Sequence, residues 1–338
     1  MIIYYIICYN TNVVVLMELI LDYLKRDLLS IDKNGWQDVD GVVCNLLAYI
    51  NYKIDKKTTI KELYENNNKD KLLELLVNNN RYKDLVIEDI TKIKNDEIQF
   101  GAIKIDLLGN KCIAFQGTDG SIVGWKENFN ISFYYPTKTQ EVAINYLKDN
   151  MEDNIVIVGH SKGGNLAIVS ALNLSVKDRK RIKRIMNFDG PGLITRVYRS
   201  KRSLLIRDKI STYLPETSIV GIFMRNYNTK CIKAKGHGFY EHILTSWYIE
   251  DYKLVDGILS KDSKKGNRAS IYAVDNYDLD ECKIVVERFF ELLKEYKVSE
   301  WKDLNNIDVD ELFTELDKVH VSKEIRAYYM VIFRNMIH

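Results

Sequence analysis

The sequence predicts an α/β fold in which a mostly parallel central sheet is covered by helices on both faces. Apolar segments of strand length alternate with segments of helical periodicity between residues 100 and 232. One of them, residues 154–159, is apolar on both sides, which is typical of a strand buried on both faces. A turn flanked by Gly159 and Gly163 then joins this strand directly to a helix, as expected for the connections of a parallel sheet.

The chain has the composition of a globular protein with a large core. It has 338 residues, of which 46% are hydrophobic, enough for one large domain. Its 49 Lys and Arg and 47 Asp and Glu give a formal charge of +2, and no basic block alternates with aromatic residues, so we expect no nucleic-acid partner. The five cysteines lack C-x-x-C pairing, which is typical of reduced thiols and predicts a cytoplasmic protein without a zinc site.

The N-terminal residues 1–16 differ from the rest of the chain. They are apolar, but the polar residues 9–12 interrupt them, and no Lys or Arg precedes Lys25, so they fit neither a membrane span nor a signal peptide. Met17 begins a more ordinary amphipathic pattern. We therefore expect residues 1–16 to be an extraneous N-terminal extension, with a buried first strand as the alternative, and we expect no integral membrane insertion.

Residues 17–274 are expected to form the domain that contains the sheet. Within it, residues 53–98 are rich in Lys, Asn and Glu and are expected to form a helical peripheral segment. A basic excursion at residues 196–209 precedes the last strands. Residues 275–338 have amphipathic patterns that predict C-terminal helices packed on the same domain. The predicted elements are helices over residues 17–52, a hairpin over 100–118 with its turn at Gly109-Asn110, a helix over 139–149, a strand at 154–159, a helix over 162–174, and strands at 184–188, 210–215 and 229–235.

The turn at residues 159–163 reads GHSKG, which is the pattern G-x-S-x-G. Between a strand and a helix this pattern forms a sharp turn that presents its central serine, and small residues are needed where strand and helix converge. The helix N-terminus offers free N–H groups for a developing oxyanion, the amide of Lys162 first. We interpret Ser161 as a nucleophile; the alternative is a serine in a tight turn without chemistry.

A nucleophilic serine needs a general base, which is usually a histidine oriented by a carboxylate. Position in the chain narrows the choice among the five histidines. His242 follows a late predicted strand, where the order serine, acid, histidine expects the base, and Leu244 and Trp247 could wall a pocket. We therefore favour His242. The other histidines are expected to pack inside the turn (His160), to lie between glycines in another turn (His237), or to lie on the surface of the C-terminal helices (His320 and His338).

Two carboxylates are candidates for the residue that orients His242. Asp189 ends the strand that follows the serine helix, which places it at the same edge of the sheet as Ser161. Glu216 ends the next strand. Because carboxylates at strand ends often only cap the following turn, the sequence favours Asp189 and leaves Glu216 open as the alternative acid.

Several motifs together resemble one protein family. They are AFQGTDGSIVGWKENFNISF, GHSKGGNLA, NFDGPG, PETSIVG and EHILTSW. In this combination the chain resembles the Mbeg-like family of uncharacterised bacterial lipase-like α/β-hydrolases, which is distantly similar to class 3 lipases. The resemblance runs from Met17 nearly to the end of the chain, and it implies an α/β-hydrolase fold for residues 17–274.

The resemblance also suggests a second oxyanion donor. In class 3 lipases the loop after an early strand, which reads F-R-G-T or similar, supplies this donor, and the matching residue here is Thr118. The alternative is that residues 117–120 are simply a turn. Gln116 stands where arginine is usual, so another group must fix the loop. The class 3 acid position, near PETSIVG, holds no aspartate, which is a further reason to prefer Asp189.

Two other features have a functional and an ordinary interpretation. Lys162 at the mouth of a pocket would favour an anionic substrate, or it forms a salt bridge with Asp119 or Asp189. The aromatic residues after the loop either line an acyl pocket or belong to the core, which is the more common role. These residues are Trp125, Phe129, Phe133 and Tyr134.

The sequence thus predicts a serine hydrolase, esterase-like or lipase-like, that cleaves a carboxylic ester or related acyl compound without a metal or organic cofactor. The Lys- and Asn-rich residues 53–98 would make a poor apolar lid, which favours small or medium acyl substrates. Two alternatives remain: an acyltransferase or thioesterase that uses the same residues, and a catalytically silent scaffold that binds a protein or lipid partner. The oligomeric state is left open.

Overall fold

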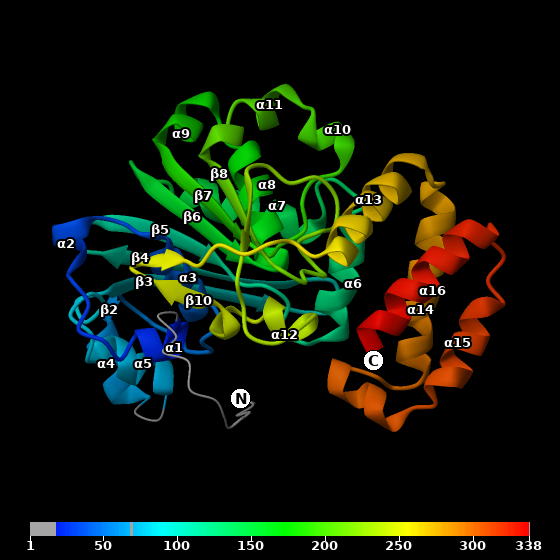
Figure 1. The fold of residues 1–338 in the computed structure, drawn as a ribbon, viewed down its shortest axis with the longest axis horizontal. Coiled ribbons are helices and arrows are strands. Elements are labelled where there is room, and N and C mark those ends of the chain that lie inside the picture. The colour runs from blue at the N-terminus through cyan, green and yellow to red at the C-terminus, as the bar shows by residue number, and fades with distance from the viewer. Residues whose placement is uncertain (1–17, 68–69, 338) are drawn as a thin grey trace.

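The computed structural model describes residues 18–67 and 70–337 (Figure 1). The expected N-terminal extension at residues 1–16 lies outside the described residues, as does His338. In the part of the chain that is described, no helix combines the length and apolar character needed to cross a membrane.

Within the described residues, the centre of the fold is a sheet of eight strands that lie side by side in the order in which they occur in the sequence. The pairings from β5 to β9 are parallel, and those from β2 to β5 are antiparallel. The predicted α/β class with a mostly parallel sheet is therefore confirmed. The strands are β2 (Thr58–Thr59), β3 (Val86–Lys94), β4 (Gln99–Leu107), β5 (Asn110–Phe115), β6 (Ile155–His160), β7 (Ile182–Phe188), β8 (Ile210–Pro215) and β9 (Thr229–Ile232).

The predicted hairpin is formed by β4 and β5. Leu107 pairs with Asn110, so Leu108 and Gly109 form a two-residue loop. Both loop residues have positive φ, 50° and 81°, which is the combination of a type I′ turn, whose twist matches that of the strands. Strand β5 ends at Phe115, shortly before the predicted end, and the residues that follow form a loop at the carboxyl end of the parallel strands.

Helices cover both faces of the sheet (Figure 1). On one face, α3 (Asp38–Leu47) packs against β5 and β6. On the other face lie α7 (Lys138–Asp149) and α8 (Lys162–Leu172), which also pack against each other. The alternation within β4 supplies both cores, because Ile103 belongs to the core on the α3 side and Ala102 to the core on the α8 side.

Two N-terminal segments differ from the sequence prediction. Of the segment expected to be helical at residues 17–52, the described residues 18–52 contain, besides α3, only the short helices α1 (Ile20–Tyr23) and α2 (Ile31–Asn34). Residues 53–98, expected to be a helical periphery, also contribute β3, which pairs with β4 in the central sheet. Most side chains of β3 are only partly buried, so its sequence lacks the apolar alternation from which a strand is predicted.

The C-terminal residues form a helical layer with its own core. The layer packs against the main domain through α6 (Ile122–Asn130). At its centre the rings of Phe289 and Phe333 stack with their centroids 3.8 Å apart. Its helices, which the amphipathic patterns predict, are α14 (Leu279–Glu295), α15 (Val309–Asp317) and α16 (Lys323–Ile337).

The remaining elements are short or peripheral. A small second sheet has the order β1-β10-β11. The elements not yet given are β1 (Glu18–Leu19), β10 (Tyr248–Glu250), β11 (Lys253–Leu254), α4 (Ile60–Asn66), α5 (Lys71–Val77), α9 (Val176–Arg181), α10 (Thr195–Tyr198), α11 (Lys201–Leu204), α12 (Phe239–His242), α13 (Lys261–Asn276) and the 3-10 turns η1 (Arg207–Lys209), η2 (Leu244–Ser246) and η3 (Trp301–Asn306).

Candidate active site

Ser161 stands on the sharp turn from β6 into α8. Its backbone has φ 55° and ψ −131°, a conformation that residues with a side chain rarely adopt. The flanking glycines are required by sterics. A Cβ at Gly159 would lie 2.0 Å from the carbonyl oxygen of Gly163, and one at Gly163 would lie 2.2 Å from that of Phe115. The local sequence therefore presents Ser161 at the carboxyl end of β6 in a strained turn.

The start of α8 gives Ser161 an environment suited to negative charge. The N–H of Ser161 donates to the carbonyl of Phe188 at 3.0 Å, which fixes the turn against β7. Among the described residues, no acceptor is hydrogen-bonded to the N–H of Lys162. The first N–H groups of a helix lack intrahelical acceptors and lie at the positive end of the helix dipole. The Lys162 amide is therefore a free donor directly beside Ser161.

Asp189 follows β7 and contacts His242. Its N–H donates to the carbonyl of Tyr213 in β8 at 2.8 Å, and its positive φ of 47° turns the chain at the strand end. The completely buried carboxylate lies with Oδ2 2.6 Å from Nδ1 of His242. Oδ1 accepts hydrogen bonds from the Ser218 hydroxyl at 2.5 Å and the Gly221 N–H at 3.1 Å. With Nδ1 donating to Asp189, Nε2 of His242 is left free to accept a proton.

The two alternative residues lie elsewhere. Oε1 of Glu216 accepts a hydrogen bond from the N–H of Ile258 at 2.9 Å, so this carboxylate closes a loop. Among the described residues, no hydrogen bond joins Glu216 to His242. His237 is exposed on the loop before α12. The structure therefore brings Asp189 and His242 together. It places neither Glu216 nor His237 in hydrogen-bonding contact with either of these residues.

Sequence reasoning missed Glu241, which anchors the short helix that carries His242. Its Oε2 accepts a hydrogen bond from the N–H of Thr217 at 2.6 Å, and its carbonyl accepts one from Nε1 of Trp247 at 2.7 Å. The expectation that Leu244 and Trp247 wall a pocket is wrong, because both are buried in the core on the α3 side. Trp247 instead holds the backbone of α12 in place.

His160 links His242 to the loop after β5. Its Nε2 lies 2.8 Å from the carbonyl oxygen of His242, and its Nδ1 lies 2.6 Å from the hydroxyl of Tyr49. The same hydroxyl accepts a hydrogen bond from the N–H of Gly117 at 3.1 Å. One tautomer satisfies all three contacts, with Nε2–H donating to His242 and Nδ1 accepting from Tyr49. Burial holds the pKa of His160 well below its usual range, so the ring is neutral.

The loop after β5 lies against Ser161. A Cβ at Gly117 would lie 2.9 Å from the Cβ of Ser161, so only glycine allows this approach. The Oγ1 of the next residue, Thr118, accepts a hydrogen bond from Nδ2 of Asn128 in α6 at 2.9 Å. The N–H of Thr118 has no hydrogen-bond partner in the described part of the chain. Thr118 thus offers a second free amide close to Ser161.

The side chain of Lys162 is buried, with 1% of its surface exposed. Its Nζ donates to Oε2 of Glu127 at 2.7 Å and to both the carbonyl and Oε1 of Gln99 at 2.6 Å. Burial lowers the pKa of Lys162 and raises that of Glu127, while the attraction between the two charges opposes both changes. The predictions that Lys162 lies at a pocket mouth, or that it forms a salt bridge with Asp119 or Asp189, are therefore both wrong. Its ammonium group is buried and pairs with Glu127 of α6.

The loop after β5 is also held by β3 and β4. Nε2 of Gln99 donates to the carbonyl of Gly117 at 3.3 Å. Oε1 of Gln116 accepts a hydrogen bond from Lys92, which donates as well to the carbonyl of Ala48. Burial lowers the pKa of Lys92 to about 8. A lysine of β3 thus provides the cation where the resemblance expects an arginine on the loop itself.

The aromatic residues that follow the loop belong mainly to the C-terminal layer. Phe133 is buried there. Phe129 packs against Phe290, with ring centroids 5.8 Å apart. Tyr134 is exposed. These three residues have the ordinary role of packing or surface residues and do not reach Ser161 or His242 through any described ring contact.

An apolar rim lies beside His242. The ring of Phe239 is 5.4 Å from that of His242 and 6.1 Å from that of Trp125, measured between centroids. Phe239 is exposed over about half of its surface, and Tyr240 and Ile243 in the same short segment are exposed to a similar extent. The apolar rim, defined by these four residues (Trp125, Phe239, Tyr240 and Ile243), gives the surface next to the histidine an apolar character.

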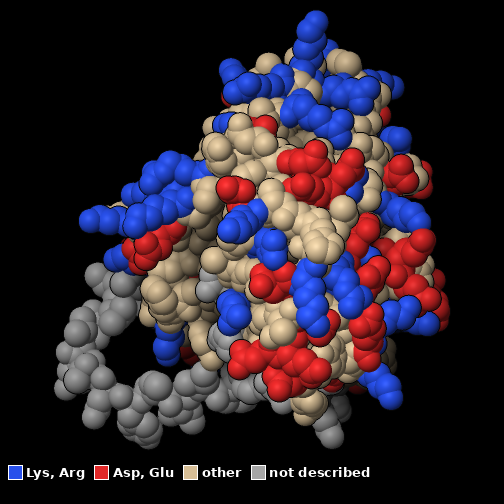
Figure 2. Space-filling model, turned by 90° about the vertical axis from the view of Figure 1, so that its right-hand side faces the viewer, with Lys and Arg blue, Asp and Glu red and all other residues tan. Residues whose placement is uncertain are grey.

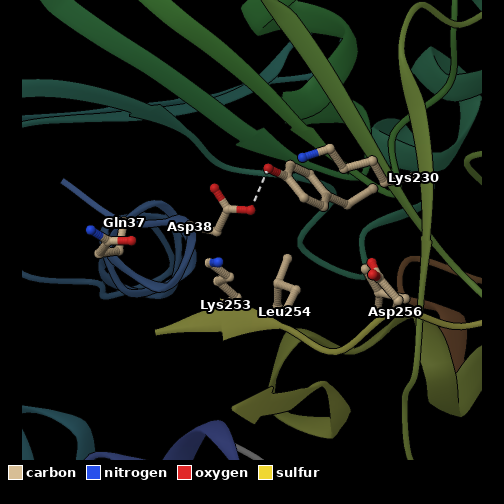
Figure 3. A pocket seen from close by; sticks show the side chains of 8 residues that line it. Gln37, Asp38, Lys230, Lys253, Leu254 and Asp256 are labelled. Atoms are coloured by element: carbon tan, nitrogen blue, oxygen red, sulfur yellow. Dashed lines mark hydrogen bonds between the residues drawn. The ribbon is translucent and has the colours of Figure 1, made fainter. Parts of the chain in front are cut away.

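A hollow of about 330 Å³ lies between α3 and the strands β8, β9 and β11 (Figure 3). Asp38, on its wall, accepts hydrogen bonds from the hydroxyl of Tyr213 at 2.8 Å and from Arg184 at 2.7 Å. The lining contains none of Ser161, Asp189 and His242, so this hollow is not part of the candidate site. The described residues also contain no group of three or more His, Cys, Asp or Glu suited to a metal ion.

The sheet order, the strained serine turn and the position of Asp189 and His242 at the same edge define an α/β-hydrolase fold of the lipase-like type. The chain belongs to the Mbeg1-like family, whose family model matches residues 76–291, and the resemblance inferred from the motifs is confirmed. None of the curated proteins matches the sequence. Among solved structures, the crystal structure of M37 lipase is similar with a TM-score of 0.38 and 15% identity, over 55% of this chain and 69% of that chain.

Proposed function

We propose that the protein is a serine hydrolase that cleaves a carboxylic ester, or a related acyl compound, through an acyl-enzyme. Ser161 is the nucleophile, His242 the general base and acid, and Asp189 the residue that orients His242. The observation that carries the proposal is the 2.6 Å hydrogen bond from His242 Nδ1 to Asp189 Oδ2, at the sheet edge where the strained Ser161 turn lies.

Each step uses a group with a defined role. Nε2 of His242 takes the proton of the Ser161 hydroxyl as its oxygen attacks the carbonyl carbon. The N–H groups of Lys162 and Thr118 bind the oxyanion of the tetrahedral intermediate. When the ester C–O bond breaks, His242 returns the proton to the leaving alcohol. Water then attacks the acyl-enzyme by the same route, which releases the carboxylic acid and regenerates Ser161, while Asp189 stabilises the imidazolium.

The apolar rim favours a substrate whose acyl group contacts the protein. Phe239 and Tyr240 are exposed next to His242, and contact with an acyl chain would remove their surface from water. Apart from Trp125, the rim consists of one short segment, which suits small or medium acyl groups better than a lipid interface. The cytoplasmic location stays a prediction from the cysteine pattern.

The test is hydrolysis of p-nitrophenyl esters whose acyl groups range from acetyl to dodecanoyl. Ser161→Ala should lower kcat by on the order of 10⁴-fold or more. The matched control is Ser170→Ala, which removes another buried hydroxyl of α8 whose only described acceptor is the carbonyl of Ala167. This control should keep wild-type kcat, and both variants should have the wild-type circular dichroism spectrum.

Two outcomes would redirect the proposal. Turnover of acyl thioesters, or acyl transfer to an added alcohol, with no ester hydrolysis would favour the thioesterase or acyltransferase alternative with the same residues. A well-folded wild type without turnover on any of these substrates, or with turnover that survives Ser161→Ala, would contradict the proposal and favour the catalytically silent scaffold.

A further inference from the structure

One end of the molecule is formed by α9, α11 and η1, which precede β7 and β8 in the chain and therefore lie at the amino ends of these strands (Figure 1). Two contacts join the segments into one surface. Nζ of Lys209 in η1 donates to the carbonyl of Arg179 in α9 at 3.0 Å. NH1 of Arg202 in α11 donates to Oδ1 of Asn173, just before α9, at 3.2 Å. We call this surface the basic end.

The basic end carries positive charges that nearby acidic side chains do not neutralise. In the described part of the chain, Lys177, Lys180 and Lys201 make no ion pair or side-chain hydrogen bond. The neighbouring acids are engaged, because Asp178 pairs with Arg181 at 3.2 Å and Asp208 lies 3.6 Å from Arg207. Figure 2 shows Lys and Arg gathered at this upper end with few Asp or Glu among them. The exposed cations of the basic end are Lys177, Lys180, Lys201, Arg202 and Arg207.

Three apolar side chains project from the same surface. Leu205 is 67% exposed, Val176 60% and Leu204 45%. The next residue, Ile206, is buried, so the chain turns inward after presenting the two leucines together. Exposed leucines bordered by unpaired cations differ from an ordinary solvated face, in which charged residues stand among other polar residues.

We infer that the basic end docks the protein on an anionic lipid bilayer. The cations would contact the headgroups, and Leu204 and Leu205 would enter the boundary between headgroups and acyl chains, as in amphipathic segments that bind anionic membranes. A bilayer accounts for both the exposed cations and the exposed leucines. A nucleic acid would use the cations but offers no apolar phase for the leucines, and the exposed residues of the basic end include no aromatic side chain that could stack on bases.

The position of the basic end sets the orientation of the docked protein. Ser161 lies at the carboxyl end of β6, whereas the basic end lies at the amino ends of β7 and β8. The strained serine turn therefore faces away from the bilayer, and docking leaves it open to the aqueous side. The inference is independent of the proposed hydrolase function, since none of its residues belongs to the candidate active site.

The test is co-sedimentation of the full chain with vesicles. One set of vesicles consists of phosphatidylcholine alone and the other contains phosphatidylglycerol as well. The protein should bind the anionic vesicles, not the neutral ones, and salt on the order of 0.5 M should release it because it screens the attraction. Lys177→Gln/Lys180→Gln/Lys201→Gln should weaken binding by about fivefold for each cation removed. Leu204→Ser/Leu205→Ser should weaken binding to the anionic vesicles at low salt, where the wild type binds.

The matched control is Lys264→Gln/Lys265→Gln on α13, which neutralises two exposed lysines outside the basic end and should leave binding unchanged. Thermal unfolding of each variant should match that of the wild type, because the substituted side chains are exposed. Absence of binding to anionic vesicles, equal binding to neutral vesicles, or an equal loss in the control would overturn the inference. The inference would also be overturned if the protein bound duplex DNA or RNA more tightly than anionic vesicles and the leucine variant retained this binding. That result would identify a nucleic-acid surface.

Discussion

The two ends of the parallel strands β6, β7 and β8 differ in how their polar side chains are bound. At the carboxyl ends, Asp189 and Lys162 are buried, and every polar atom of their side chains has a fixed partner. At the amino ends, Lys177 and Lys201 are exposed, and no described residue pairs with them. A side chain fixed by hydrogen bonds keeps one geometry, which catalysis requires, whereas an exposed cation without an ion-pair partner can adapt its position to a binding partner.

This difference implies that substitutions at the two ends have different consequences. Changes at the carboxyl ends should alter the rate of a reaction or the free energy of unfolding, because they disturb buried and connected groups. Changes at the amino ends should alter binding alone. Substitutions at each end can therefore test whether the two ends differ in this way.

The largest effect is expected for Asp189→Asn. An amide at this position cannot stabilise the imidazolium and favours the wrong tautomer of His242, so kcat for an ester should fall by on the order of 10⁴-fold. Glu216→Gln is the matched control, because this carboxylate bonds the N–H of Ile258 instead. Steady-state kinetics of the two variants decide the matter, and a larger loss in Glu216→Gln would transfer the role to that residue.

The next largest effect concerns the buried ion pair. Lys162→Met leaves Glu127 charged and buried without its cation, which should lower the free energy of unfolding by about 3–5 kcal/mol. The double variant Lys162→Met/Glu127→Leu should recover most of this loss. Urea unfolding gives the values. Lys138→Met breaks an exposed ion pair with Glu97 and should change the unfolding little; an equal loss there would show that the buried position is unimportant.

A smaller, pH-dependent effect is expected for His160. Burial holds its pKa well below the ordinary value of 6.5, so below that pH the unfolded chain binds a proton that the native state does not. The free energy of unfolding therefore falls as the pH falls, by at most about 1.4 kcal/mol per pH unit from this group. His160→Gln should flatten this dependence in urea unfolding between about pH 7 and pH 5. Parallel curves for wild type and variant would show that His160 is not held neutral.

The smallest effect is expected at the basic end. Lys177→Gln/Lys180→Gln/Lys201→Gln should change kcat/KM for a water-soluble ester by less than about twofold, since exposed substitutions rarely act over a distance. Adding anionic vesicles should likewise leave the rate on this substrate unchanged. A strong change in either case would mean that the two ends of the strands are coupled.

The sequence predicted what depends on local patterns. Apolar alternation and the positions of glycines predict the hairpin, the parallel strands and the Ser161 turn, because each signal lies within a few residues. The carboxylate at the end of β7 could be proposed because parallel strands end at one edge of the sheet. Asp189 and His242 stand in contact there, but their catalytic roles stay a proposal.

What the sequence could not predict depends on contacts between distant residues. Tyr49 reaches His160 across 111 residues, and Glu127 reaches Lys162 across 35. The sequence does not distinguish a buried lysine from an exposed one, so no local pattern indicated that Lys162 is buried. The strand β3 was missed because its half-buried residues carry no clear period.

Labelling with a fluorophosphonate probe shows whether Ser161 is an activated nucleophile. The probe forms a covalent bond only with a serine whose hydroxyl is activated by a base. We expect wild type and Ser170→Ala to be labelled, and Ser161→Ala and His242→Ala to remain unlabelled. Well-folded wild type that takes up no label, or Ser161→Ala that is labelled as strongly as wild type, would contradict the account.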